Sequence, residues 1–264
     1  MPKIGYGYAL YTGSPSSLPS DISGLGLWLK ADAGVSLSGS NVTAWADQSG
    51  NNLNFSSLTG VGQATEYPSI VSSGIAGKPS MSFLNSLMRS PNLNIGSNGL
   101  SVFVVGYSKG DEDTGGSGGD LQPYINLSDM ASAPWDAWLV GAYAGSGTDS
   151  GAAFVSSNDG VDYFSITYGN AVNTARIITY MCGSGTLSAF VNGSLANSVS
   201  APNPQSLNKP MGIGNRSIID EGAEPGSREN FDGLISEIIV YDKLLTTTER
   251  KQVEGYLNAK YAIY

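Results

Sequence analysis

The stretch that decides the fold is "ISEIIVYDKLLTTTERKQVEGYL", residues 235–257, in which an apolar run directly precedes a helical pattern. Residues 235–241 are apolar at nearly every position, which is typical of a buried strand. Two carboxylates, Glu237 and Asp242, lie in and beside this strand. Because side chains alternate along a strand, two residues five positions apart point to opposite faces, whereas the paired carboxylates of a glycosidase must face each other.

The position of Glu237 therefore indicates a structural role. On a regular strand it shares its face with Ile235, Ile239 and Tyr241. We interpret Glu237 as a scaffold carboxylate held by backbone donors or by an arginine, and Asp242 as part of the turn into the helix.

The residues after the strand predict one helix. Thr246 followed by Glu249 fits a capping box, in which each residue satisfies a backbone N–H of the other. An apolar stripe at helical spacing follows, made of Val253, Tyr256, Leu257 and Tyr261. We expect the helix to lay this stripe on a sheet.

The rest of the chain consists of short segments with period-two alternation, such as "GLGLWLKAD", "LSVFVVGYS", "ARIITYMCG" and "LSAFVNGSLANSVS". Asn192-Gly193 is a strong hairpin signal, since both residues can adopt positive φ. Ten or more short strands at this spacing predict an all-β fold, a two-layer sandwich or a jelly roll, with one C-terminal helix. We assign residues 22–264 to this domain and residues 1–21 to an N-terminal arm.

The arm is rich in Gly, Ser and Pro and carries Tyr6, Tyr8 and Tyr11. It has two interpretations: an arm without contacts, or an assembly contact that orders against a neighbouring subunit. Tyrosines favour the second, because they supply contact area at low entropy cost.

Composition excludes several classes of function. The 264 residues include 13 Lys+Arg and 22 Asp+Glu, a net charge of −9, with no histidine and one cysteine. Without a basic cluster we expect no nucleic-acid partner, and without histidine any catalysis would rest on carboxylates. The first twenty residues do not resemble a Sec signal, and no apolar run is long enough to span a bilayer, so we expect no membrane insertion.

Several segments resemble, in the same order, the laminin-G-like jelly rolls of the concanavalin A-like lectin/glucanase superfamily, over roughly residues 22–264. The opening strand leads to a "W-D-SG" turn, here Trp45, Asp47, Ser49 and Gly50. The closing motif comprises Gly233, Ile235, Glu237, Ile239, Tyr241, Asp242, Leu245, Glu249, Tyr256, Leu257, Lys260 and Tyr261.

The resemblance implies two antiparallel sheets, one of them concave, and a C-terminal helix. The glucanase branch carries its acid and its nucleophile as "E-D--E" on one strand, and "SEIIVYD" lacks the central Asp and the final Glu. We therefore predict that the chain is not an enzyme. We interpret Asp47 as a side chain that organises its turn.

Two groups of residues are weak candidates for binding. Trp135, Trp138 and Tyr143 could stack on sugar rings or pack on a partner, or could be core aromatics; the two tryptophans are three apart, so a strand would send them to opposite faces. Asp111, Asp113 and Asp120 lie in an acidic glycine-rich loop that could bind calcium, or could simply be a solvated loop without an EF-hand pattern.

The leading hypothesis is a non-enzymatic phage virion protein: a capsid decoration, head fibre or tail-attached protein that forms a homo-oligomer and contacts host-surface glycans. It rests on the resemblance and on the lack of a Sec signal, anchor or second domain in this sequence. The alternative is a free carbohydrate-binding lectin module, which would be secreted. A carbohydrate-active hydrolase is third.

Overall fold

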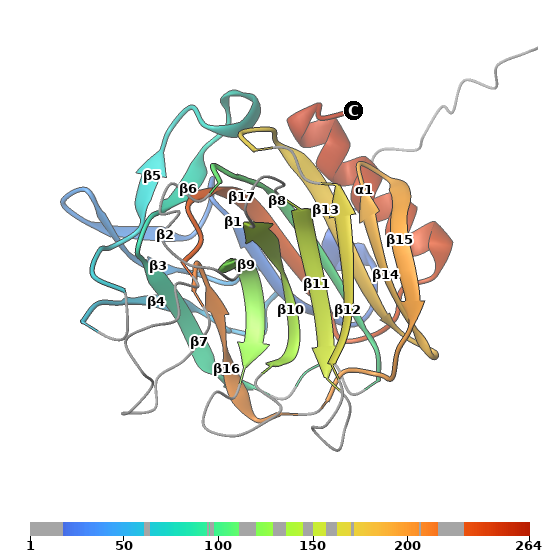
Figure 1. The fold of residues 1–264 in the computed structure, drawn as a ribbon. Helices are drawn as coiled ribbons and strands as arrows, with labels where there is room; N and C mark the ends of the chain where they lie inside the picture. The colour runs from blue at the N-terminus through green and yellow to red at the C-terminus, as the bar shows by residue number, and fades with distance from the viewer. Residues whose placement is uncertain are drawn as a thin grey trace, which may run out of the picture.

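The structure is a computed structural model that describes residues 18–60, 64–93, 95, 98–110, 120–128, 136–144, 150–156, 163–169, 172–205, 207–215 and 230–264. Seventeen short strands in these residues form two antiparallel layers (Figure 1). The front layer has, in order across it, β4 (Phe55–Leu58), β7 (Leu87–Leu93), β16 (Lys209–Ile213), β9 (Asp120–Ser128), β10 (Asp136–Ala144), β11 (Ser150–Ser156) and β12 (Tyr163–Gly169).

The back layer contains the closing strand of the sequence motif near its centre. Its order is β1 (Leu25–Lys30), β17 (Gly233–Tyr241), β8 (Leu100–Ser108), β13 (Arg176–Gly183), β14 (Thr186–Val191) and β15 (Ser194–Ser200). Four further strands join the layers at one end: β2 (Val35–Ser38), β3 (Asn41–Trp45), β5 (Ser69–Val71) and β6 (Ser80–Phe83). The predicted all-β jelly-roll sandwich is confirmed.

Alternation along the back strands divides the apolar side chains between two cores. On β8, Val102 and Val104 point into the core between the layers, which also holds Trp45. Phe103 and Val105 point to the opposite side, where they meet the helix. The central strands β8, β13 and β17 are therefore buried on both faces, which accounts for their nearly continuous apolar sequence.

The helix α1 (Thr247–Tyr261) covers the outer face of the back sheet. Its capping box is present as predicted: Thr246 Oγ1 accepts from the Glu249 N–H (3.2 Å), and Glu249 Oε2 accepts from the Thr246 N–H (2.8 Å). Val253, Leu257 and Tyr261 of the predicted stripe are buried against the sheet. In the described part of the chain no helix has the length and apolarity needed to cross a membrane.

The strand β17 departs from the regular alternation expected of it. Its pairing with β8 shifts register between Ile235 and Glu237, so that Ser236 forms a bulge. Ile235 lies in the core between the layers, whereas Ile239 and Tyr241 lie on the helix side. The prediction that Ile235 shares a face with Glu237 was wrong, because an extra residue in a strand reverses the alternation beyond it.

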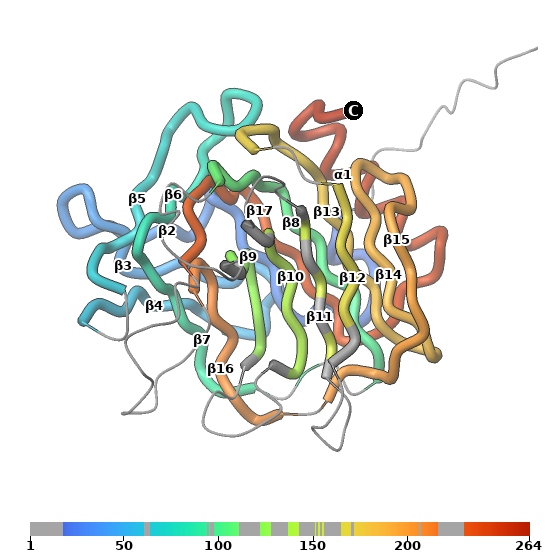
Figure 2. Tube along the Cα trace, viewed as in Figure 1, coloured from blue at the N-terminus to red at the C-terminus, as the bar shows by residue number. Residues whose placement is uncertain are grey.

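The first and the last strand of the described chain lie side by side. Figure 2 shows the blue first strand beside the red last one, and β1 pairs with β17 from Leu25↔Tyr241 to Lys30↔Glu237. A short 3-10 turn, η1 (Pro19–Asp21), packs here, where the Tyr241 hydroxyl donates to the Pro19 carbonyl (2.8 Å). A second such turn, η2 (Ile75–Gly77), precedes β6. Tyr6, Tyr8 and Tyr11 lie outside the described residues.

Candidate functional site

The carboxylate of Asp47 organises the turn between β3 and β4. Its Oδ1 accepts from the backbone N–H groups of Trp28 (3.0 Å) and Ser49 (2.8 Å), and its Oδ2 accepts from that of Leu53 (3.1 Å). The interpretation of Asp47 as a turn residue is confirmed.

Glu237 is buried between the back sheet and α1, with 1% of its surface exposed. Its Oε1 accepts from Trp28 Nε1 (2.6 Å) and the Tyr256 hydroxyl (3.0 Å). Its Oε2 accepts from Lys260 Nζ (2.8 Å) and the Tyr261 hydroxyl (2.9 Å). The scaffold role is confirmed, but the expectation of backbone donors or an arginine was wrong: four side chains hold the carboxylate.

The tyrosines of this cluster remain neutral donors. Burial raises the pKa of both Tyr256 and Tyr261, and the nearby charge of Glu237 raises the pKa of both further. With both carboxylate oxygens occupied and almost no exposure, the cluster offers no position to a substrate. We refer to Glu237, Trp28, Tyr256, Lys260 and Tyr261 as the Glu237 cluster.

The aromatic candidates from the sequence separate into one core residue and two that the structure does not test. Trp138 lies on β10 with no exposed surface, inside the core between the layers. A surface contact by Trp138 is therefore a wrong prediction: the register of β10 turns it inward. Trp135 lies outside the described residues, and the side chain of Tyr143 on β10 does too.

The calcium candidates also fall largely outside the described residues. Asp111 and Asp113 are not described, and Asp120 is described only as the first backbone position of β9. Among the described residues, no group of three acidic, cysteine or histidine side chains could hold a metal ion. Cys182 is buried, and burial raises the pKa of its thiol to about 12, so it is protonated at neutral pH.

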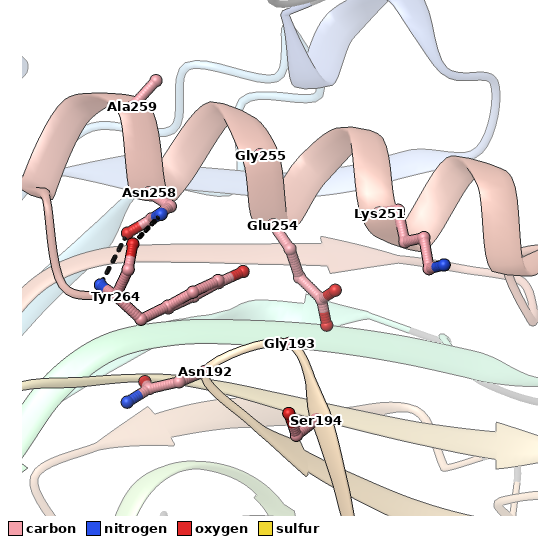
Figure 3. A pocket seen from close by; sticks show the side chains of 9 residues that line it. All are labelled: Asn192, Gly193, Ser194, Lys251, Glu254, Gly255, Asn258, Ala259 and Tyr264. Atoms are coloured by element: carbon pink, nitrogen blue, oxygen red, sulfur yellow. Dashed lines mark hydrogen bonds between the residues drawn. The ribbon is translucent and has the colours of Figure 1, made fainter. Parts of the chain in front are cut away.

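A groove of about 610 Å³ lies between α1 and the turn that joins β14 to β15 (Figure 3). The hairpin contributes residues 192–194, the helix contributes Lys251, Glu254 and Asn258, and Tyr264 forms one wall. We call it the α1–hairpin groove. It lies on the outer face of the back sheet, on the far side of that sheet from Trp138.

The hairpin turn has the geometry predicted from its sequence, with φ of +50° at Asn192 and +77° at Gly193. Asn192 Oδ1 accepts from the Ile177 N–H (3.0 Å), which fixes the side-chain amide beside the groove. The Asn192 Nδ2 group and the Ser194 hydroxyl meet no partner among the described residues. The turn therefore presents two hydrogen-bonding groups to the groove.

Tyr264 is held over the turn by the end of the helix. Ala262 adopts the left-handed conformation (φ +47°), and Asn258 Oδ1 accepts from the N–H groups of Ile263 and Tyr264 (2.9 Å each). Asn258 Nδ2 donates to the Tyr264 carbonyl. Gly193 lies directly beneath the ring, since a Cβ there would lie 2.9 Å from the Tyr264 hydroxyl oxygen. Tyr264 remains 53% exposed.

Glu254 borders the groove, but its charge is compensated. Arg250 donates to both of its carboxylate oxygens (2.7 Å each), and the Thr179 hydroxyl donates to Oε1 (3.0 Å). The Arg250 guanidinium also lies 3.9 Å from the centre of the Phe190 ring. Lys251, by contrast, is exposed and has no acidic partner among the described residues.

The groove thus combines a half-exposed aromatic ring with an amide, a hydroxyl and an ammonium group. Such a mixture binds small polar molecules that have one apolar face. Sequence reasoning identified the hairpin only as a turn and did not identify Tyr264. No local signal pointed to Tyr264, because the left-handed residue that ends the helix is Ala262 and not the glycine or asparagine usual at that position.

Sequence comparisons find neither a matching family model nor a matching curated protein. Comparison of structures finds receptor-binding domains of toxins. The binding domain of Paraclostridial Mosquitocidal Protein 1 matches with a TM-score of 0.60 and 15% identity, over 91% of this chain and 54% of that chain. The botulinum neurotoxin type G receptor binding domain matches with a TM-score of 0.58 and 15% identity, over 89% and 52%.

A third match is the ligand binding domain of botulinum neurotoxin serotype D, solved in complex with N-acetylneuraminic acid, with a TM-score of 0.57 and 16% identity, over 88% and 51%. The chain spans about half the length of these binding domains. At this identity the comparison shows the fold alone: the chain is a jelly roll of the kind found in these toxin binding domains.

Proposed function

We propose that the chain is a non-catalytic, lectin-like module that binds carbohydrate. The observation that carries the proposal is the fold, which matches toxin receptor-binding domains along about nine tenths of the chain, one of them solved with a bound sugar. This supports the lectin alternative over the virion hypothesis.

The α1–hairpin groove supplies a candidate site. The apolar C–H face of a pyranose ring can pack on an aromatic ring such as Tyr264, which is half exposed and whose backbone is held by Asn258. The sugar hydroxyls can then bond to the Asn192 amide and the Ser194 hydroxyl. Both groups are held at the tip of a tight turn, so little flexibility is lost on binding.

The carboxylates near the helix support a non-catalytic role. Glu237 accepts four hydrogen bonds, and Glu254 is paired with Arg250, so neither is available to donate or accept a proton from a sugar. A glycosidase needs two carboxylates facing each other across the scissile bond.

A glycan array with the purified chain tests the proposal. We expect binding to a subset of glycans, and Tyr264→Ala should weaken it by roughly 10-fold, since the stacking surface is lost. Tyr67→Ala is the matched control, because Tyr67 is also exposed (40%) but lies outside the groove. An array without any signal contradicts the proposal.

A third variant, Trp135→Ala, distinguishes the two candidate surfaces. If this variant loses glycan binding and Tyr264→Ala keeps it, carbohydrate binding stands and the site is the one predicted around Trp135 and Tyr143.

The virion role, with its expected homo-oligomer and host-surface contact, remains a prediction from the sequence. The fold match gives it no support. Detection of the chain in purified phage particles at a fixed copy number would establish it, and secretion of the chain would favour the free module.

A further inference from the structure

The charges around the α1–hairpin groove point to the class of sugar that it takes. Two charged side chains line the groove, Lys251 and Glu254. Glu254 is 2% exposed and its carboxylate is neutralised by Arg250, which itself is 6% exposed. Of these two side chains, Lys251 is therefore the one whose charge has no opposite partner among the described residues.

Lys251 differs from most lysines of the described residues. Three of them form ion pairs: Lys109 with Asp232, Lys243 with Glu249, and Lys260 with Glu237. A fourth, Lys30, has its ammonium 4.4 Å from the centre of the Trp28 ring. Lys251 and Lys78 have neither kind of partner among the described residues. Of these two, Lys251 alone lies at the groove.

The position of Lys251 relative to Tyr264 suits a two-point contact. Both line the same groove, with Glu254 between them on the helix side and Ser194 on the hairpin opposite (Figure 3). A saccharide that packs one ring on Tyr264 can extend along the groove past Ser194 and present a carboxylate to Lys251. An ammonium group binds a carboxylate more strongly than a hydroxyl, because both partners are charged.

We propose that the α1–hairpin groove binds an acidic saccharide, with Lys251 as the group that selects for the carboxylate of the sugar. This inference rests on the proposed carbohydrate function. It makes Lys251 a specificity-determining residue, while Tyr264, Asn192 and Ser194 hold the ring whatever its charge.

The test compares each acidic glycan with its own neutral form. A glycan array is probed before and after its carboxylates are converted to carboxamides, with the wild-type chain, Lys251→Gln and Lys78→Gln. The best acidic hit and its carboxamide are then titrated in solution against the same three proteins. Both lysines are exposed, so neither variant should change the thermal midpoint.

We expect the wild-type chain to bind the acid about 3- to 10-fold more tightly than the carboxamide, as a single exposed charge pair allows. Lys251→Gln should make the two affinities equal, and Lys78→Gln should leave the preference unchanged. Equal binding of acid and carboxamide by the wild-type chain overturns the inference, as does a preference that survives in Lys251→Gln.

These outcomes separate the two proposals. Equal binding of a glycan's acidic and carboxamide forms, lost for both in Tyr264→Ala, leaves the carbohydrate function standing and refutes the acidic preference. A chain that binds no sugar, acidic or neutral, refutes both.

Discussion

The two sides of α1 carry the same buried chemistry, but only one of them borders a groove. On one side Glu237 meets Lys260, and on the other Glu254 meets Arg250, so each side has a buried carboxylate paired with a cation of the helix. Around Glu237 the side chains of Trp28, Tyr256 and Tyr261 close the space and use the remaining lone pairs. Around Glu254 the space stays open as the α1–hairpin groove.

The comparison shows that a buried carboxylate by itself says little about function. A carboxylate whose lone pairs are all used holds elements together, because removing any partner leaves an uncompensated group away from water. Glu254 lies beside the groove, but Arg250 compensates its charge, so the other residues that line the groove determine what binds there. The function of the open side is therefore set by Lys251, Tyr264 and the hairpin turn.

The largest effect is expected at the closed side. Glu237→Ala leaves the Trp28 indole N–H and two tyrosine hydroxyls without their shared acceptor. The Lys260 ammonium loses its buried partner and keeps only its ion pair with the more exposed Asp32 (3.0 Å). We expect the free energy of unfolding in urea to fall by about 3–5 kcal/mol. Glu66→Ala, at an exposed position, is the control and should change it by less than about 0.5 kcal/mol. A fall in the free energy of unfolding of less than about 1 kcal/mol would show that the hydrogen bonds to Glu237 do not hold the helix on the sheet.

At the open side, Arg250→Met should cost about 2–4 kcal/mol in unfolding free energy. The methionine keeps an apolar contact with Phe190 but leaves Glu254 buried without a cation. The double variant Arg250→Met/Glu254→Leu should recover most of this loss, since the isolated charge is removed. If the double variant is as unstable as the single one, the ion pair is not the cause.

Two tyrosines near the end of the helix provide a direct comparison of the sides. Tyr261→Phe removes a hydrogen bond to the charged Glu237 carboxylate in a buried site, and should cost about 1.5–3 kcal/mol. Tyr264→Phe lies at the exposed groove and should change stability by less than about 0.5 kcal/mol. Chemical unfolding measures both, and equal effects would contradict the distinction between closed and open sides.

The smallest effect concerns the start of the helix, where Glu249 pairs with Lys243 at the surface. The hydrogen bonds from Lys243 and Thr246 lower the pKa of Glu249 to about 2. Because this lies below the ordinary value of 4.5, the ionised form stabilises the fold above about pH 4.5, and that contribution is lost as the pH falls toward 2.

Glu249→Gln should therefore make the thermal midpoint fall less steeply between pH 5 and pH 2. The side chain is 26% exposed, so the difference should stay below about 1 kcal/mol and shrink at high salt. A pH profile identical to that of the wild-type chain would exclude the contribution.

The sequence predicted the helix start and the hairpin turn, because both are determined by residues close together in the chain. The capping box of Thr246 and Glu249 and the positive φ values at Asn192 and Gly193 depend on residues within a few positions of each other. The alternation of apolar residues predicted the two-layer sandwich because each strand had to bury a face.

The partners of Glu237 could not be predicted in this way. Trp28 is 209 positions away along the chain and reaches Glu237 only because β1 pairs with β17. The bulge at Ser236 likewise arises from the pairing with β8, and the order of apolar and polar residues in β17 does not predict it. The α1–hairpin groove brings together a turn and a chain segment separated by about 70 residues, through packing that no local pattern encodes.

The central place of β17 has a consequence for biosynthesis. At a ribosomal rate of roughly 5–20 residues per second, about 10–40 seconds separate the synthesis of Trp28 from that of Glu237. During that interval β17, the neighbour of β1, has not been synthesised, and the side chains of Leu27 and Leu29 cannot be buried as they are in the folded protein. Assembly of this layer must therefore wait for the last strand, and the apolar side chains of β1 stay without their final partners until then.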